Sequence, residues 1–361
     1  MTVTPRRRRL SPATFRLPIQ RIREGYYSDQ YFNLTKSLLE ADGHRPEVLM
    51  QVFQKRDSIL GGIDEALAIL RECSGTCSPD GAWHEGWDRL EVHALYEGDE
   101  IAPREPVLTI RGDYALFAHL ETVYLGCLAR RTLVMRNVHD VVQAARGKEI
   151  LFFPARHDHW LVQTGDGWAA HVAGAIGVST DAQASWWGGR GVGTVPHALI
   201  AAYGGDTVAA AQAFARHYAS DMNITVLVDF ANDSVGTALQ VADALGDDLW
   251  GVRLDTSEAL VDKALEGTDL RGVQPELVEK VRSALDAAGH ERVRIVVSGG
   301  FSVDKINRFE ELGVPVDAYG VGSSLIRGSN DFTADVVEVD GRPCAKVGRG
   351  RIDSPRLERV V

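Results

Sequence analysis

From residue 149 onward, short apolar stretches alternate with amphipathic ones, and this alternation constrains the fold more than any other feature of the chain. Near-continuous apolar strands are typical of parallel sheets that are buried on both faces. Two of the amphipathic stretches end at Gly289 and Gly313, and glycine is the residue that most often terminates a helix. The predicted strands lie within residues 149–153, 174–180, 225–230, 249–255, 293–300 and 316–324.

Repeated units of a strand followed by a helix predict an α/β fold with a parallel sheet. Because there are many such units, we expect the sheet to close into an irregular, TIM-like β/α barrel over residues 136–330. An open, doubly wound sheet is the alternative. A dinucleotide-binding half is not expected, because no GxGxxG sequence opens a helix after a strand.

The first third of the chain has a different pattern. Apolar residues at three- and four-residue spacing predict a helix over 48–73, and a period near two predicts short antiparallel strands within 90–116. Residues 116–146 are expected to form one long helix or a helix pair. Together these segments predict an N-terminal α/β domain over residues 21–135.

Both ends of the chain bear on this N-terminal domain. Residues 331–351 have the pattern of a β-hairpin with its turn at Asp340 and Gly341, so we expect 331–361 to return to the domain and complete it. Residues 1–20 contain four consecutive arginines and no apolar stretch, and they are predicted to be a disordered basic tail.

The composition limits the class of function. With 39 basic and 50 acidic residues the net charge is −11, which argues against general binding to nucleic acid. No apolar run approaches the length of a membrane span. Of the four cysteines only Cys73 and Cys77 are closely spaced, and no second pair completes a zinc site. We therefore expect no zinc, and reduced thiols in a cytoplasmic enzyme.

Candidate site residues follow from the barrel prediction, because the C-terminal ends of the strands carry the active site in such folds. The side chains and glycines at these ends are Phe153, Arg156, His157, Ser179, Asp229, Arg253, Asp255, Ser298, Gly299, Gly300, Gly320, Gly322 and Ser323.

The glycines after the last two predicted strands indicate a phosphate site. Glycine allows backbone N–H groups to approach an anion closely, and the serines beside these glycines add hydroxyl donors. A phosphate site after the final strands is a recurrent feature of β/α barrels. Tight turns between strand and helix would also explain these glycines.

Charged side chains also lie at the ends of the predicted strands 225–230 and 249–255. Arg253 and Asp255 are two residues apart on a strand, so their side chains leave on the same face. Arg253 would neutralise a phosphate or carboxylate, while Asp255 would bind ribose hydroxyls or Mg²⁺. Asp229 is a second, weaker candidate for Mg²⁺. A surface ion pair between Arg253 and Asp255 is the alternative.

His197 opens a predicted helix directly after a proline. A helix N-terminus favours the neutral, nucleophilic imidazole, so His197 is a candidate catalytic residue. A histidine at a helix start can equally be a capping or core residue.

Residues 149–161, "EILFFPARHDHWL", leave a choice between a metal site and a clamp for a flat anion. His157 and His159 flank an aspartate, but no third ligand is apparent nearby. Phe153 with Arg156 would instead hold a flat ring and its negative charge. We expect the clamp.

Six segments, taken in order, resemble nicotinate phosphoribosyltransferase. More broadly they resemble the type II phosphoribosyltransferase group, which also includes the quinolinate and nicotinamide enzymes. The resemblance runs from about residue 25 to residue 330. The segments are "YSDQYFNLT", "FFPARHDH", "GTVPHALI", "GVRLDTS", "VVSGGFSVDKI" and "GVGSSL".

The resemblance implies an N-terminal α/β domain, an irregular barrel and a head-to-tail homodimer with shared active sites. It also implies transfer of the phosphoribosyl group of phosphoribosyl pyrophosphate to nicotinate in NAD biosynthesis, with Mg²⁺ required and ATP as a co-substrate. No zinc is implied.

Several site roles are also implied by the resemblance alone. Phe153 resembles the aromatic residue that stacks on the pyridine ring, and Tyr31 with Asp29 resembles its counterpart from the neighbouring subunit. His197 resembles the histidine that ATP phosphorylates. Arg156 resembles the arginine at the base and diphosphate, Arg253 and Asp255 the pair at the base and ribose, and Gly299, Gly300, Gly322 and Ser323 the loops at the 5′-phosphate.

The choice of base can be argued physically. Nicotinamide enzymes place an aspartate near the amide, where it would repel a carboxylate, and the corresponding residue here is Ser179. Quinolinate enzymes carry a Thr-Arg-Lys run that this sequence lacks. We therefore expect nicotinate, with quinolinate or nicotinamide transfer, or a catalytically inactive metabolite-binding barrel, as alternatives.

Overall fold

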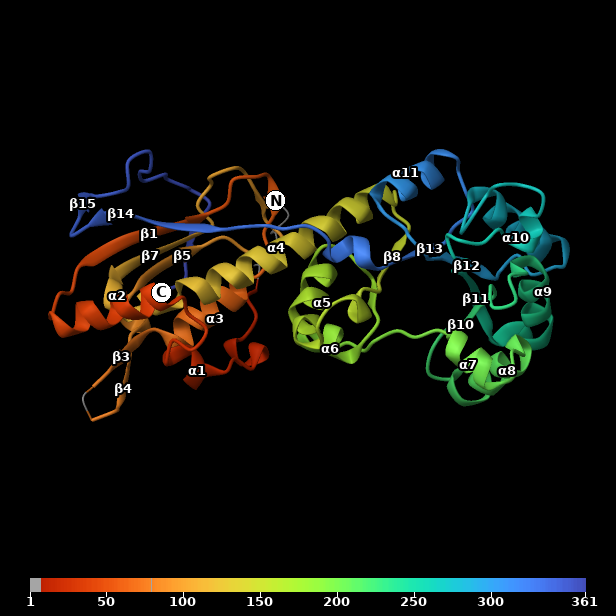
Figure 1. Ribbon diagram of the computed structural model, residues 1–361, viewed down its shortest axis with the longest axis horizontal. Coiled ribbons are helices and arrows are strands. Elements are labelled where there is room, and N and C mark those ends of the chain that lie inside the picture. The colour runs from red at the N-terminus through yellow and green to blue at the C-terminus, as the bar shows by residue number, and fades with distance from the viewer. Residues whose placement is uncertain (1–7, 79) are drawn as a thin grey trace, which may run out of the picture. The chain divides into compact units, whose positions relative to one another are not determined.

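A computed structural model of the chain describes residues 8–78 and 80–361 and contains two compact units (Figure 1). Unit 1 consists of the residues up to Arg136 together with Gly328–Val361, and unit 2 is Asn137–Arg327. The predicted domains, 21–135 with 331–361 and 136–330, have nearly the same bounds. The chain is of the α/β class, as predicted.

Unit 1 is built on a six-stranded antiparallel sheet in the order β15-β14-β1-β7-β5-β16. Its apolar face packs against α3 and the first part of α4, which form the core of the unit. The strands are β1 (Glu47–Phe53), β5 (Glu91–Ala94), β7 (Leu108–Asp113), β14 (Thr333–Val339), β15 (Arg342–Pro343) and β16 (Glu358–Arg359).

Helices and short strands complete unit 1. The helices are α1 (Ile19–Arg23), α2 (Gln30–Ala41), α3 (Ile63–Cys73) and α4 (Glu121–Ala144), which runs on into unit 2. Two small ribbons pair β2 (Ser58–Ile59) with β6 (Glu100–Ile101) and β3 (Gly75–Cys77) with β4 (Trp83–Glu85). The prediction over residues 116–146 is confirmed as one long helix.

The predicted helix over 48–73 is wrong in its first half. Residues 47–53 form β1, which lies between β14 and β7, and only 63–73 are helical. Every residue of β1 after Glu47 is buried, including the polar Gln51, so buried and exposed positions do not alternate along the strand. Periodicity alone does not distinguish such a strand from a buried helix.

The predicted disordered tail is too long. Residues 12–15 form a turn of 3₁₀ helix, and Phe15 is buried. The carboxylate of Asp64 accepts hydrogen bonds from the Arg9 guanidinium at 2.9 Å and from the Leu10 backbone N–H at 2.8 Å. The buried carboxylate of Asp64 therefore orders Arg9 and Leu10, which composition alone assigns to a disordered tail. The part of the prediction that concerns residues 1–7 lies outside the described residues.

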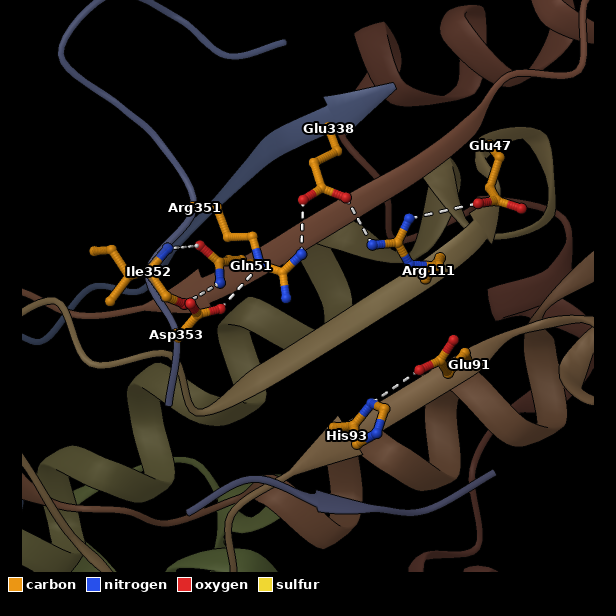
Figure 2. Close-up of polar contacts among 9 residues, drawn as sticks. All are labelled: Glu47, Gln51, Glu91, His93, Arg111, Glu338, Arg351, Ile352 and Asp353. Atoms are coloured by element: carbon orange, nitrogen blue, oxygen red, sulfur yellow. Dashed lines mark hydrogen bonds and ion pairs between the residues drawn. The ribbon is translucent and has the colours of Figure 1, made fainter. Parts of the chain in front are cut away.

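The C-terminal segment completes unit 1, as predicted. Asp340 and Gly341, with φ values of 48° and 72°, form the turn between β14 and β15. Figure 2 shows how the chain then crosses the outer face of the sheet: the Gln51 side chain pairs with both backbone groups of Ile352, at 2.5 and 2.9 Å. Glu338 accepts from Arg111 at 2.6 Å and from Arg351 at 2.8 Å.

Unit 2 is a curled parallel sheet surrounded by helices, in the order β10-β11-β12-β13-β8-β9. Its strands are β8 (Glu149–Phe152), β9 (Gly177–Val178), β10 (Ile224–Leu227), β11 (Leu249–Leu254), β12 (Arg294–Val297) and β13 (Ala318–Val321). Its helices are α5 (Gln163–Val172), α6 (Asp181–Ala184), α7 (His197–Ala202), α8 (Thr207–Tyr218), α9 (Ser234–Leu245), α10 (Pro275–Ala287) and α11 (Val303–Glu311).

An extended segment, residues 192–195, closes the sheet into the predicted irregular barrel. The Val192 N–H donates to the carbonyl of Val178 in β9, at 2.7 Å, and the Val195 N–H donates to that of Thr225 in β10, at 2.9 Å. We call this segment the seam. The sequence prediction missed it, because its single bridge and its glycine do not resemble an apolar strand.

We predict that Gly62→Ala destabilises unit 1 more than Gly43→Ala. Both glycines have positive φ, where alanine costs about 1–2 kcal/mol. A Cβ at Gly62 would also lie 2.8 Å from the backbone oxygen of Cys127, and overpacking adds about 1–3 kcal/mol. At Gly43 a Cβ would meet nothing within 4 Å. Urea unfolding of both variants measures the difference, and equal losses would contradict this account.

Candidate active site

A pocket of about 680 Å³ lies at the C-terminal ends of the barrel strands, within unit 2. Thirteen predicted site residues line it: Phe153, Arg156, His157, Ser179, His197, Arg253, Asp255, Ser298, Gly299, Gly300, Gly320, Gly322 and Ser323. Asp229 is not in the lining but hydrogen-bonds to His197. Tyr31 belongs to unit 1, where its side chain is 60% exposed and its hydroxyl lies 3.4 Å from Asp29.

Arg253 is the centre of a hydrogen-bond network in the pocket. Its Nε donates to Ser298 Oγ at 2.8 Å, and its two terminal nitrogens donate to Thr194 Oγ1 and Asp255 Oδ2, each at 3.2 Å. Ser298 in turn donates to Asp255 Oδ1 at 2.8 Å. Burial lowers the pKa of Arg253 from its ordinary value, and the carboxylate of Asp255 opposes this shift. The guanidinium stays charged, since arginine is not deprotonated in proteins.

Phe153 provides a flat apolar surface beside this charge. Its ring centroid lies 5.4 Å from the Arg253 guanidinium carbon, and its backbone N–H donates to Val321 of β13. A Cβ at Gly320 would lie 2.9 Å from two ring carbons, so the absence of a side chain there makes room for the ring. The cation over the ring is thus Arg253, whereas the predicted clamp paired Phe153 with Arg156, which lines the same pocket.

His197 forms a pair with Asp229. Its Nε2 lies 3.0 Å from Asp229 Oδ1, and the aspartate side chain is only 7% exposed. Burial raises the pKa of Asp229, while the hydrogen bond from His197 opposes this. Because a carboxylate only accepts, Nε2 carries the shared hydrogen, and in the neutral imidazole the lone pair is then on Nδ1. The sequence argument from the helix terminus is thus incomplete: α7 has six residues, and a carboxylate fixes the ring.

The two glycine loops border the same pocket. Gly299 and Gly300 have φ values of 87° and 67°, which favour glycine, and they precede α11. The Lys305 ammonium donates to the Gly299 carbonyl at 3.1 Å and holds the loop against the helix. A Cβ at Gly322 would lie 3.0 Å from the His157 ring. Both loops thus leave backbone close to the pocket, as an anion site requires.

The structure limits the metal sites that can be considered. Within residues 8–78 and 80–361, no three or more His, Cys, Asp or Glu side chains are arranged to hold a metal ion, at residues 157–159 or elsewhere. Mg²⁺ usually takes one or two carboxylates and completes its shell with substrate phosphates and water. Asp229 and Asp255 fit that requirement, since they approach each other closely enough for charge to act between them. All four cysteines are free.

Sequence reasoning missed two residues that support the site. Thr194 binds Arg253 from the seam, although it lies inside the quoted "GTVPHALI" segment. Gln183 accepts from the backbone N–H of Ser179 at 3.0 Å and from its hydroxyl at 3.1 Å. No spacing rule identifies Thr194 from sequence, but Gln183 stands three residues after Thr180 in a capping box, a pattern that the sequence does show.

Fold and site together define a β/α-barrel protein whose pocket at the C-terminal mouth has two arginines and two glycine loops in its lining. The family model described as the quinolinate phosphoribosyl transferase N-terminal domain matches residues 29–132. The crystal structure of nicotinate-nucleotide pyrophosphorylase from Pyrococcus furiosus has 33% sequence identity and a TM-score of 0.79, over 92% of this chain and 80% of that one. The chain therefore belongs to the type II phosphoribosyltransferase group that it resembles in sequence.

Other relatives agree with this assignment. Nicotinate phosphoribosyltransferase pncB1 of Mycobacterium tuberculosis is 33% identical over 267 residues, which are 72% of this chain and 56% of that protein. This chain thus spans little more than half the length of that relative. Human nicotinic acid phosphoribosyltransferase shares the fold, with 18% identity and a TM-score of 0.64 over 88% of this chain and 76% of that one. Among the described residues, the helices are too short or too polar to cross a bilayer.

Gly320→Ala tests the contact that positions Phe153. The added methyl group would meet the ring at 2.9 Å, so we expect the ring to tilt and the free energy of unfolding to fall by about 1–3 kcal/mol. Gly193→Ala is the matched control, because a Cβ there would meet nothing within 4 Å. Chemical denaturation and a crystal structure of each variant provide the comparison. An unmoved ring in Gly320→Ala would refute the argument.

Proposed function

We propose that the chain transfers the phosphoribosyl group of phosphoribosyl pyrophosphate to nicotinate in NAD biosynthesis, giving nicotinate mononucleotide and diphosphate. One observation carries the proposal: a single pocket contains Phe153 beside Arg253, Asp255, and two glycine loops. A ring, a carboxylate, a ribose and a phosphate each have a chemically suitable partner there. The relatives named as nicotinate phosphoribosyltransferases support the choice of base.

The base would lie flat on Phe153 with its carboxylate toward Arg253. Stacking on an aromatic ring and a charge-assisted hydrogen bond are both favourable in a partly buried site. Ser179 would face the carboxylate without charge, whereas an aspartate there would repel it. Its hydroxyl can turn from Gln183 to the ligand, because two backbone N–H groups still occupy the Gln183 oxygen.

Phosphoribosyl pyrophosphate would occupy the rest of the pocket. Its 5′-phosphate fits the loops at Gly299, Gly300, Gly322 and Ser323, its ribose hydroxyls fit Asp255, and its diphosphate fits Arg156. The bond between C1 and the diphosphate oxygen breaks, and the diphosphate leaves with the electron pair. The lone pair of the pyridine nitrogen forms the new bond to C1, so no proton needs to move.

Catalysis would then come from positioning and charge. Holding the two substrates in one orientation removes most of the entropic cost of their meeting. Arg156 and Arg253 would neutralise charge on the leaving group and on the base. When bound, Mg²⁺ would neutralise diphosphate charge, with Asp229 or Asp255 supplying a carboxylate.

ATP is the proposed co-substrate, and His197 is the proposed phosphoryl acceptor. Nδ1 of His197 would attack the γ-phosphorus, the bond to the ADP oxygen would break, and ADP would leave with that electron pair. Asp229 would hold the ring and stabilise the positive charge that develops on it. We further propose a homodimer in which Tyr31 and Asp29 complete a neighbouring site, and a cytoplasmic location consistent with four free thiols.

Quinolinate is the second candidate base. The matching N-terminal family model carries that name. Quinolinate brings a second carboxylate next to the diphosphate, which requires additional cations. The pocket lining contains two arginines, Arg156 and Arg253, and no lysine, which favours the base with a single carboxylate.

The proposal is tested by diphosphate release from phosphoribosyl pyrophosphate with nicotinate, quinolinate or nicotinamide, each with and without ATP. We expect release with nicotinate, stimulated by ATP, and little with the other two bases. Faster release with quinolinate would shift the assignment to that base. No turnover with any base would favour a metabolite-binding barrel that has lost catalysis.

Replacing His197 tests the coupling to ATP separately. We expect His197→Ala to abolish base-dependent ATP hydrolysis while transfer without ATP continues, because His197 is not required to break the C1–O bond. His290→Ala is the matched control, since His290 also pairs with an aspartate, Asp243, at 2.8 Å outside the pocket. Assays of ADP and nicotinate mononucleotide measure both reactions. ATP hydrolysis that survives in His197→Ala would exclude this role.

A further inference from the structure

Arg253 carries a positive charge at a largely buried position, so the direction of its donors decides what the pocket binds. Its side chain is 18% exposed. A guanidinium has five N–H donors in one plane, and fixing any two of its nitrogens fixes that plane. Three donors are already engaged, one each by Ser298, Thr194 and Asp255. Two donors, one on each terminal nitrogen, therefore remain for a ligand.

The three partners come from different parts of the barrel. Asp255 directly follows β11, which carries Arg253 itself, and Ser298 follows β12, the neighbouring strand. Thr194 instead belongs to the seam, which lies on the other side of β10. Thr194 therefore contacts Arg253 from the β10 side of β11, whereas Ser298 contacts it from the β12 side.

We propose that Thr194 is a positioning residue: its hydroxyl oxygen turns the guanidinium of Arg253 so that the two remaining donors face the carboxylate of a pyridine-carboxylate base. This inference rests on the proposed function and deepens it. Thr194 also lines the pocket, so it lies where a bound ligand would be close to it. Its effect would be on recognition of the base rather than on phosphoribosyl pyrophosphate.

The seam is suited to hold one hydroxyl in place. The seam makes two backbone hydrogen bonds, from Val192 to β9 and from Val195 to β10. Thr194 lies between these two anchored residues in the chain. Val195 is fully buried, which fixes the segment against the barrel interior. Pro196 follows and limits the backbone further before α7 begins. Little freedom is left for Thr194, so the orientation of Arg253 is set before a ligand arrives.

Valine is the informative substitution, because it keeps the shape of threonine and removes the acceptor oxygen. We expect Thr194→Val to raise the dissociation constant for nicotinate about tenfold, the effect of losing orientation of one charge-assisted hydrogen bond. The dissociation constant for phosphoribosyl pyrophosphate should change less than about twofold. Thr194→Ser, which keeps the acceptor, should restore nicotinate binding.

Thr256→Val is the matched control. Thr256 directly follows Asp255, is buried, and its hydroxyl makes no hydrogen bond with any described residue. The same chemical change one residue from the site should therefore leave both dissociation constants unchanged. If it reproduced the effect of Thr194→Val, general loosening of the barrel would be the cause and the proposal would be wrong.

The experiment is calorimetric titration of the full chain with nicotinate and with phosphoribosyl pyrophosphate, followed by steady-state kinetics. Selective loss of nicotinate affinity in Thr194→Val, with recovery in Thr194→Ser, supports the proposal. Equal losses for both ligands, or no loss, would overturn it. If the wild type binds nicotinate without turnover, the proposed function fails while the Thr194 comparison still decides. If the wild type does not bind nicotinate, both fail.

Discussion

A charged guanidinium in a largely buried position is costly unless its donors are paired, and this requirement governs the arrangement around Arg253. The carboxylate of Asp255 supplies the opposite charge, and Ser298 joins the two side chains. Because Ser298 and Asp255 also reach the end of β12, the charge and the glycine loop at Gly299 are held in one network. The glycine loop proposed for the phosphate and the side chains proposed for the base therefore share a single support.

The position of the pocket could be predicted from sequence, because the active site of a β/α barrel lies at the C-terminal ends of its strands. Parallel strands with apolar interiors were recognisable, and their C-terminal ends gave twelve of the residues that line the pocket, while His197 was found from its place at a helix start. Within the barrel, the prediction failed at the seam, where a single bridge replaces a strand and apolar periodicity gives no signal. The same failure concealed Thr194, which acts only through its contact with Arg253.

In unit 1 the errors have a different physical origin. β1 was taken for a helix because it is buried along nearly its whole length, so the alternation that marks a strand is absent. Arg9 was assigned to a disordered tail because local composition cannot reveal a partner such as Asp64, 55 residues away. The turn at Asp340 and Gly341 was found because positive φ at both positions favours this residue pair. The sequence thus predicted a turn that depends only on local backbone conformation. It did not predict a contact between residues far apart in the chain.

The pairing of β14 with β1 has a consequence for biosynthesis. Unit 2 is one continuous stretch, whereas the sheet of unit 1 needs residues that are translated after all of unit 2. During synthesis the barrel can thus fold while β1 still lacks its neighbour, with an exposed apolar edge that invites wrong pairing. Val48 and Val339, nearly three hundred residues apart, can pair only after the whole of unit 2 has been translated. We therefore expect the late pairing step of maturation in the sheet of unit 1, while the barrel with the candidate active site can already be folded.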